Sequence, residues 1–132
     1  MRVAFLDEER AIEELVERVQ GLLVNDERVI AVGLFGSLAR GRALPSSDAD
    51  LLIVLRTHPE ARWIDRISEY ASAFGGTALP VEVFPYTLRE LTRVASRPGL
   101  IRTILREYVF LGGDEEILAN LRDASHGHYD GN

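Results

Sequence analysis

Three acidic side chains in this chain have the type and spacing that metal-assisted chemistry requires. Asp48 and Asp50 stand two residues apart at the start of the apolar run Leu51-Leu52-Ile53-Val54-Leu55. This spacing puts both carboxylates on one face of a strand, with Cα atoms about 6.6 Å apart. Glu82 is the polar residue within Val81-Glu82-Val83-Phe84. Such carboxylates can share one hard cation, or hold two cations side by side.

A glycine–serine turn precedes these acids and could hold a phosphate group. Gly36 and Ser37 lie where an apolar strand passes into a short helix, and unpaired backbone N–H groups at such a junction favour an anion. Gly36 and Gly41 also have the spacing of a P-loop. That motif is excluded, because Arg42 and Ala43 occupy the positions that require Lys and Ser or Thr. A plain helix-capping role for Ser37 stays open.

Composition limits the classes of protein that the chain can represent. Its 132 residues, 46% hydrophobic and 27% charged, indicate a globular domain, which we expect over residues 1–124, followed by a loose polar tail at 125–132. No cysteine is present, which excludes disulfides, thiolate metal sites and cysteine nucleophiles. The N-terminus turns acidic too early for a signal peptide, and no apolar run is long enough to cross a membrane. We therefore expect a cytoplasmic protein.

All 15 basic residues are arginines, and the formal net charge is −6. The absence of lysine excludes Schiff-base chemistry and a lysine general base. The negative charge disfavours a general nucleic-acid binder. Arg89, Arg93 and Arg97 nevertheless recur every four residues. This arginine stripe is either a solvated helix face or a surface for a nucleic-acid acceptor or an acidic partner.

Hydrophobic periodicity predicts an α/β (α+β) fold with a small mixed sheet of three to four strands flanked by helices. If Gly36 and Asp50 contact the same ligand, the strands that they border are antiparallel. The strands before and after the helix at 62–74 are expected to be parallel, which brings Glu82 beside Asp50. Pro85 is expected to stop the third strand, and Thr87 with Glu90 has capping-box spacing. The predicted helices are 7–24, 36–41, 62–74, one from 87, one from 98 and 114–121; the predicted strands are 29–35, 50–55, 81–84 and 108–111.

Taken together, these motifs resemble the nucleotidyltransferase family that includes polymerase β, and specifically its minimal nucleotidyltransferases. The resemblance covers most of the chain, and two positions depart from the family pattern. Ala49 stands where a larger aliphatic residue is common, and Glu82 replaces the more usual Asp. The matching stretches are Gly36-Ser37 with Ala39-Arg40-Gly41, Ser47-Asp48-x-Asp50-Leu51, Glu82 between apolar residues, and Pro85 to Leu91.

The resemblance implies transfer of a nucleoside monophosphate, with AMP from ATP favoured, and two Mg²⁺ ions. It assigns Asp48, Asp50 and Glu82 to the metal ions and to catalysis. Arg40 could steady the leaving pyrophosphate, or could form a structural ion pair with the acids. The implied nucleotide-binding residues are Gly36, Ser37, Arg40, Arg42 and Ser47.

Minimal nucleotidyltransferases often act as antitoxins paired with a helical protein of the HEPN class. The resemblance therefore implies a macromolecular acceptor hydroxyl, typically a tyrosine of such a partner; a nucleic-acid acceptor is not favoured. The alternative is a module without catalysis, which binds nucleotide or neutralises its partner by contact alone. A third, weaker alternative is a small acceptor. The base of the triphosphate and the formation of a homo-oligomer are left open.

Overall fold

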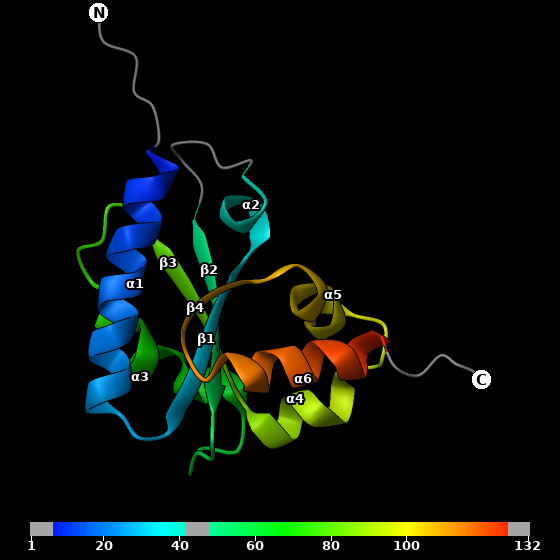
Figure 1. Cartoon of the computed structure of the whole chain (residues 1–132). Coiled ribbons are helices and arrows are strands. Elements are labelled where there is room, and N and C mark those ends of the chain that lie inside the picture. Colours follow the sequence, from blue (N-terminus) through cyan, green and yellow to red (C-terminus); the bar gives the residue numbers. More distant parts are fainter. Residues whose placement is uncertain (1–6, 42–47, 127–132) are drawn as a thin grey trace, which may run out of the picture.

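The computed structural model describes residues 7–41 and 48–126, and in this part of the chain a four-stranded sheet carries helices on both faces (Figure 1). The strand order is β3-β2-β1-β4. β2 pairs antiparallel with β1 and parallel with β3, and β4 pairs antiparallel with β1. The predicted mixed sheet and both predicted pairings are confirmed. The strands are β1 (Val29–Phe35), β2 (Ala49–Leu55), β3 (Val81–Thr87) and β4 (Val109–Gly113).

Two groups of helices cover the two faces of this sheet (Figure 1). α1 and α3 bury Leu15, Val19 and Tyr70 against one face. α4, α5 and α6 bury residues such as Leu91 and Ile104 against the other. The helices are α1 (Glu8–Asn25), α2 (Gly36–Ala39), α3 (Ile67–Ala71), α4 (Leu88–Val94), α5 (Leu100–Glu107) and α6 (Glu115–His126), with 3₁₀ turns η1 (Trp63–Arg66) and η2 (Ser72–Phe74) flanking α3.

The apolar character of the two central strands follows from this two-sided cover. Every residue of β1 is buried, and in β2 every residue except Asp50 is buried. A strand that is covered on both faces shows a continuous apolar run instead of an alternating pattern. Asp50 is therefore the one residue of β1 and β2 that is not fully buried.

The predicted end of the third strand at Pro85 is wrong, because β3 continues to Thr87. Proline lacks the N–H group that a ladder needs, but β3 lies at the edge of the sheet and can leave that position unpaired. The predicted capping box is confirmed: Thr87 Oγ1 accepts from Glu90 N–H, and Glu90 Oε1 accepts from Thr87 N–H.

The predicted continuous helix over 62–74 is also wrong, since the segment forms η1, α3 and η2 in succession. Arg66 explains the break. Its side chain turns inward and donates to the carbonyl oxygens of Glu60 and Ala61, so the chain entering the segment is held against the sheet. Ile64, which follows Trp63 in η1, is 55% exposed.

α6 extends past Leu121 to His126, so the first two residues of the predicted tail belong to a helix. Ser125 is buried and its hydroxyl donates to the carbonyl of Arg122. Residues 127–132 lie outside the described residues, and a single domain over 1–124 stays a prediction. None of the helices described here combines the length and apolarity that crossing a membrane would require.

Candidate active site

Three positions that are neighbours across the sheet bring predicted site residues together, at the end where β1 finishes and β2 and β3 begin. Asp50 lies opposite Phe35 of β1 on one side and opposite Glu82 of β3 on the other. Gly36 directly follows Phe35, and Asp48 stands one residue before β2 begins. Paired strands lie about 4.8 Å apart, so the backbones that carry the acids and the Gly-Ser turn are neighbours.

The turn at Gly36 is packed against the carboxylate of Asp50. Gly36 has a φ of +80°, a conformation that residues with a side chain rarely adopt. A Cβ atom at this position would also overlap the Asp50 carboxylate. Ser37 lies inside α2, whose N-cap is Phe35 without a side-chain cap, so Ser37 is not the capping residue. Its half-buried hydroxyl stays available for the predicted nucleotide contact.

The surroundings of Asp50 disfavour its negative charge. Burial and the neighbouring charges of Glu82 and Asp48 raise the pKa of Asp50 to about 6, and the positive charge of Arg40 opposes this rise. A carboxylate close to other carboxylates in a partly dry site gains stability when a cation arrives. A cation next to Asp50 would therefore be favoured electrostatically.

Arg40 forms an ion pair, but its partner is not one of the three acids. Its guanidinium donates to Glu107 Oε1 at the end of α5, with a distance of 2.6 Å. The pair is half exposed, so it can exchange partners with a bound anion. Arg42 and Ser47, two of the predicted nucleotide-binding residues, lie outside the described residues.

The chemistry of this donor set fits Mg²⁺. All three side chains offer carboxylate oxygens, which are the ligands that hard cations prefer, and the raised pKa of Asp50 shows that burial and its acidic neighbours outweigh the positive charge of Arg40. Within residues 7–41 and 48–126, no three acidic or histidine side chains are already gathered closely enough to enclose a metal ion. The carboxylates of Asp48, Asp50 and Glu82 are thus close enough to interact electrostatically, but they do not form a closed cluster.

An aromatic cluster beside the acids was not found by sequence reasoning. Phe84 contacts Phe35 edge-on at 5.1 Å between ring centroids and stacks on Trp63 at 5.8 Å. Trp63 also stacks on Tyr86 at 5.1 Å. Glu82, Phe84 and Tyr86 alternate along β3 and therefore share a face. That alternation was a usable signal, but the expected strand ended at Phe84.

A shallow hollow of about 270 Å³ lies beside this aromatic cluster, and its lining includes Trp63, Glu82 and Phe84. Flat apolar surface next to a carboxylate can hold an aromatic ring while the carboxylate contacts a polar group on that ring.

Comparison with known proteins agrees with this arrangement. A family model described as "Nucleotidyltransferase domain" matches residues 9–111, and the chain therefore belongs to the nucleotidyltransferase domain family. The resemblance to the minimal nucleotidyltransferases is likewise confirmed by the relatives that follow.

The curated relatives include two nucleotidyl-transferring enzymes. The bifunctional uridylyltransferase/uridylyl-removing enzyme of Cupriavidus pinatubonensis is 30% identical over 109 residues, which are 82% of this chain and 12% of that enzyme. The protein adenylyltransferase MntA of Thermococcus cleftensis is 28% identical over 80 residues, which are 61% of this chain and 72% of that protein. The chain thus spans about an eighth of the first relative and most of the second.

A solved structure with the same fold comes from a complex of a tri-AMPylated Shewanella oneidensis HEPN toxin with an MNT antitoxin. The superposition covers 92% of this chain and 86% of the matched chain, with a TM-score of 0.55 and 14% sequence identity. At this identity the likeness defines the fold. The predicted nucleotidyltransferase fold is confirmed.

Proposed function

We propose that this protein transfers AMP from ATP to a hydroxyl group of a protein partner, with Mg²⁺ bound by Asp48, Asp50 and Glu82. The observation that carries the proposal is the position of Asp50. It is half-buried between Gly36 and Glu82, and burial together with the charges of Glu82 and Asp48 raises its pKa to about 6. A carboxylate with a perturbed pKa at the edge of a sheet is typical of a functional site.

The reaction needs little from the protein beyond positioning and charge. The acceptor oxygen attacks the α-phosphorus of ATP, a new oxygen–phosphorus bond forms, and the bond to pyrophosphate breaks. Bound Mg²⁺ neutralises charge on the phosphate oxygens. Glu82, exposed at the start of β3, is placed to accept the proton of the acceptor hydroxyl. Gly36, Ser37 and Ser47 hold the phosphates, while Arg40 and Arg42 steady the pyrophosphate.

A helical partner of the HEPN class supplies the acceptor in this proposal, and AMP transfer silences that partner. Two observations support it: the relative MntA is described as a protein adenylyltransferase, and the similar fold occurs in a complex with an AMPylated HEPN toxin. The open aromatic hollow next to Glu82 gives a tyrosine ring a surface on which to stack. ATP and such a partner meet in the cytoplasm, which is the location we propose.

The test is covalent transfer of label to a HEPN-type partner protein, sought first as the product of the gene next to the one for this chain. With Mg²⁺, ATP labelled at the α-phosphate should label the partner, whereas ATP labelled at the γ-phosphate should not. Asp48→Asn and Asp50→Asn should each reduce the rate by more than ~100-fold, because a direct metal ligand is lost.

Asp123→Asn is the matched control, since it makes the same chemical change at an exposed position of α6. It should keep the wild-type rate. Transfer by Asp50→Asn at the wild-type rate contradicts the mechanism. ATP binding without any transfer, together with neutralisation of the partner by both variants, would identify a contact-only module instead.

A further inference from the structure

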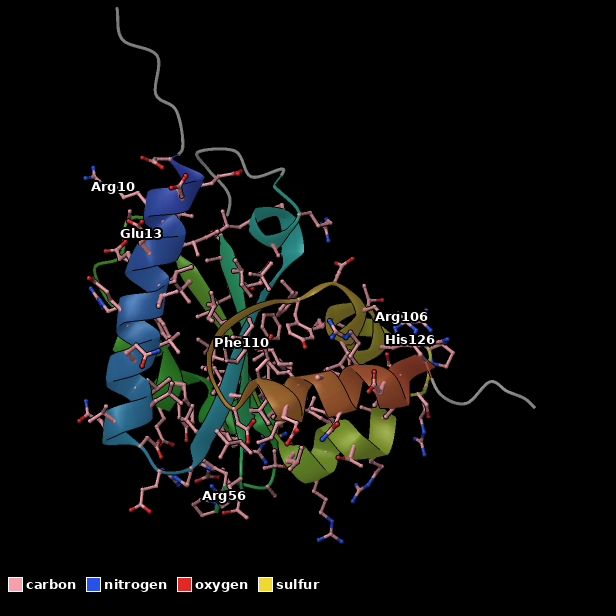
Figure 2. All side chains as sticks on the ribbon, viewed as in Figure 1. Arg10, Glu13, Arg56, Arg106, Phe110 and His126 are labelled. Atoms are coloured by element: carbon pink, nitrogen blue, oxygen red, sulfur yellow. The ribbon has the colours of Figure 1, made fainter. Side chains whose placement is uncertain are left out.

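A second charged site lies at the opposite end of the sheet from the carboxylates. Arg56 directly follows β2, and Figure 2 shows it at the end of the sheet away from α2. The length of β2, seven residues, separates it from Asp50 by about 20 Å at ~3.3 Å per residue. Arg56 borders a hollow of about 320 Å³ that also includes Arg66, Arg89 and Arg93 in its lining. The arginine stripe of the sequence thus contributes two of its three members to a concave surface.

The floor of this hollow is already paired and fixed. Arg66 is 2% exposed and binds Glu90 through both carboxylate oxygens, at 2.8 and 3.0 Å. Both ring nitrogens of His58 are also engaged, with Glu69 Oε1 at 2.7 Å and the backbone N–H of Glu60 at 3.0 Å. The floor residues therefore cancel one another's charge and hold the hollow in shape.

The rim, in contrast, carries positive charge without a compensating acid. Arg56, Arg89 and Arg93 are exposed, and none forms an ion pair within the described part of the chain. Arg89 and Arg93 are four residues apart in α4 and so project from the same side of the helix. Three guanidinium groups around one hollow create a positive local potential that favours anions, although the net charge of the protein is −6.

We propose that this arginine-rimmed hollow binds the phosphate groups of a small molecule, as a site separate from the carboxylate edge. Guanidinium groups match phosphate oxygens through two parallel hydrogen bonds, and the hollow has the dimensions of one or two phosphates rather than of an extended strand. The net negative charge of the chain further disfavours a long polyanion. The phosphate can come from a free inorganic ion or from a nucleotide.

The test is titration calorimetry of the full chain with inorganic pyrophosphate in EDTA, so that metal-mediated binding at the carboxylates is absent. Wild type and Asp50→Asn should both show saturable binding with one site per chain. The double variant Arg89→Gln/Arg93→Gln should weaken binding by at least ~10-fold, and Arg56→Gln should weaken it as a second, independent probe. Arg97→Gln is the matched control: it removes the same charge from the stripe, outside the hollow, and should change affinity by less than ~2-fold.

Parallel titrations identify the source of the phosphate. Tighter binding of ADP than of pyrophosphate supports a nucleotide ligand, and the reverse supports the inorganic ion. The proposal is overturned if pyrophosphate binding is not saturable, or if Arg97→Gln weakens it as much as the double variant. Tighter binding of a short single-stranded RNA, with equal dependence on Arg97, would also overturn it, because the stripe would then be a nucleic-acid surface. Loss of AMP transfer leaves this test unaffected.

Discussion

Two half-buried carboxylates of this domain, Asp50 and Glu90, have opposite surroundings. Burial alone would raise the pKa of Glu90, but hydrogen bonds from Arg66 and from Thr87 hold it below its ordinary value. Burial likewise raises the pKa of Asp50, and there the neighbouring Glu82 and Asp48 raise it further, to about 6. Within residues 7–41 and 48–126, Glu90 therefore has a guanidinium in contact, whereas Asp50 has none.

This difference separates the scaffold of the protein from its candidate site. The Arg66–Glu90 pair ties η1, β3 and α4 together, with Arg66 also donating to the carbonyl of Pro85. Among the described residues, Asp48 and Asp50 at the start of β2 form no side-chain hydrogen bond or ion pair, and the charges of Asp48 and Glu82 disfavour that of Asp50. A charge that stabilises the fold has a partner of opposite charge inside the protein. A charge that serves function is instead compensated by a ligand from outside the protein.

The largest effect on stability should come from breaking the paired region. Arg66→Met removes the guanidinium that donates to Glu90 and to several carbonyl groups, and we expect a loss of about 3 kcal/mol in the free energy of unfolding. Arg62→Met is the control, because Arg62 is a neighbouring arginine whose pair with Asp65 is exposed. It should change the free energy of unfolding far less than Arg66→Met, because exposed ion pairs contribute little to stability. Denaturant melts measure both, and equal losses would show that Arg66 has no special structural role.

A smaller effect should come from crowding the unpaired region. Gly36 and Gly41 both have positive φ, but a Cβ atom would meet Asp50 only at Gly36, and nothing within 4 Å at Gly41. We expect Gly36→Ala to cost about 2 kcal/mol and Gly41→Ala about 1 kcal/mol. In an Asp50→Ala background the excess cost at Gly36 should disappear. An excess that survives there would mean that the Gly36 turn is not packed on the Asp50 carboxylate.

The smallest effect distinguishes the two carboxylates by pH. Because the pKa of Asp50 is raised in the folded protein, its contribution to stability is full below about pH 4 and is lost as pH rises through 6. In EDTA, Asp50→Asn should therefore be as stable as wild type at pH 4. At pH 8 it should be more stable, by about 1 kcal/mol after discounting for exposure of the group.

Glu90 should give the opposite slope. Its pKa is lowered, so its contribution is present above about pH 4.5 and is lost as pH falls below that value. Glu90→Gln should be less stable than wild type at pH 7, with a difference that shrinks in acid. Melting curves at matched ionic strength measure both variants. A loss of stability in Asp50→Asn at pH 8 would contradict the comparison.

Much of the fold could be predicted because the central strands are apolar without interruption and the helices carry clear periodicity. The pairing of β1 with β2 followed from requiring Gly36 and Asp50 to contact one ligand, and the parallel pairing of β2 with β3 followed from the helical connection between them. The features that were missed depend on tertiary contacts. β3 can continue through Pro85 because it is an edge strand. The helix breaks at Arg66 because the guanidinium group of this residue is buried against distant partners, which no local sequence pattern reveals.

The site was predicted by residue type and spacing, but its charge balance was not. The pairing of Arg40 with Glu107 joins residues that are 67 positions apart, and sequence left open whether Arg40 would pair with the acids. The aromatic contacts of Trp63 likewise join η1 to β3. Such choices among competing partners are decided by three-dimensional packing, whereas strand alternation is decided locally.

The central claim is that Asp48, Asp50 and Glu82 form a cation-dependent nucleotide site, and calorimetric titration with ATP tests it most directly. Wild type should bind ATP at least ~10-fold more tightly with Mg²⁺ than in EDTA, since the cation joins phosphate oxygens to the carboxylates. Asp50→Asn should lose this Mg²⁺-dependent gain, while Asp123→Asn should retain it. Equal ATP affinity with and without Mg²⁺ in the wild-type protein would contradict the account.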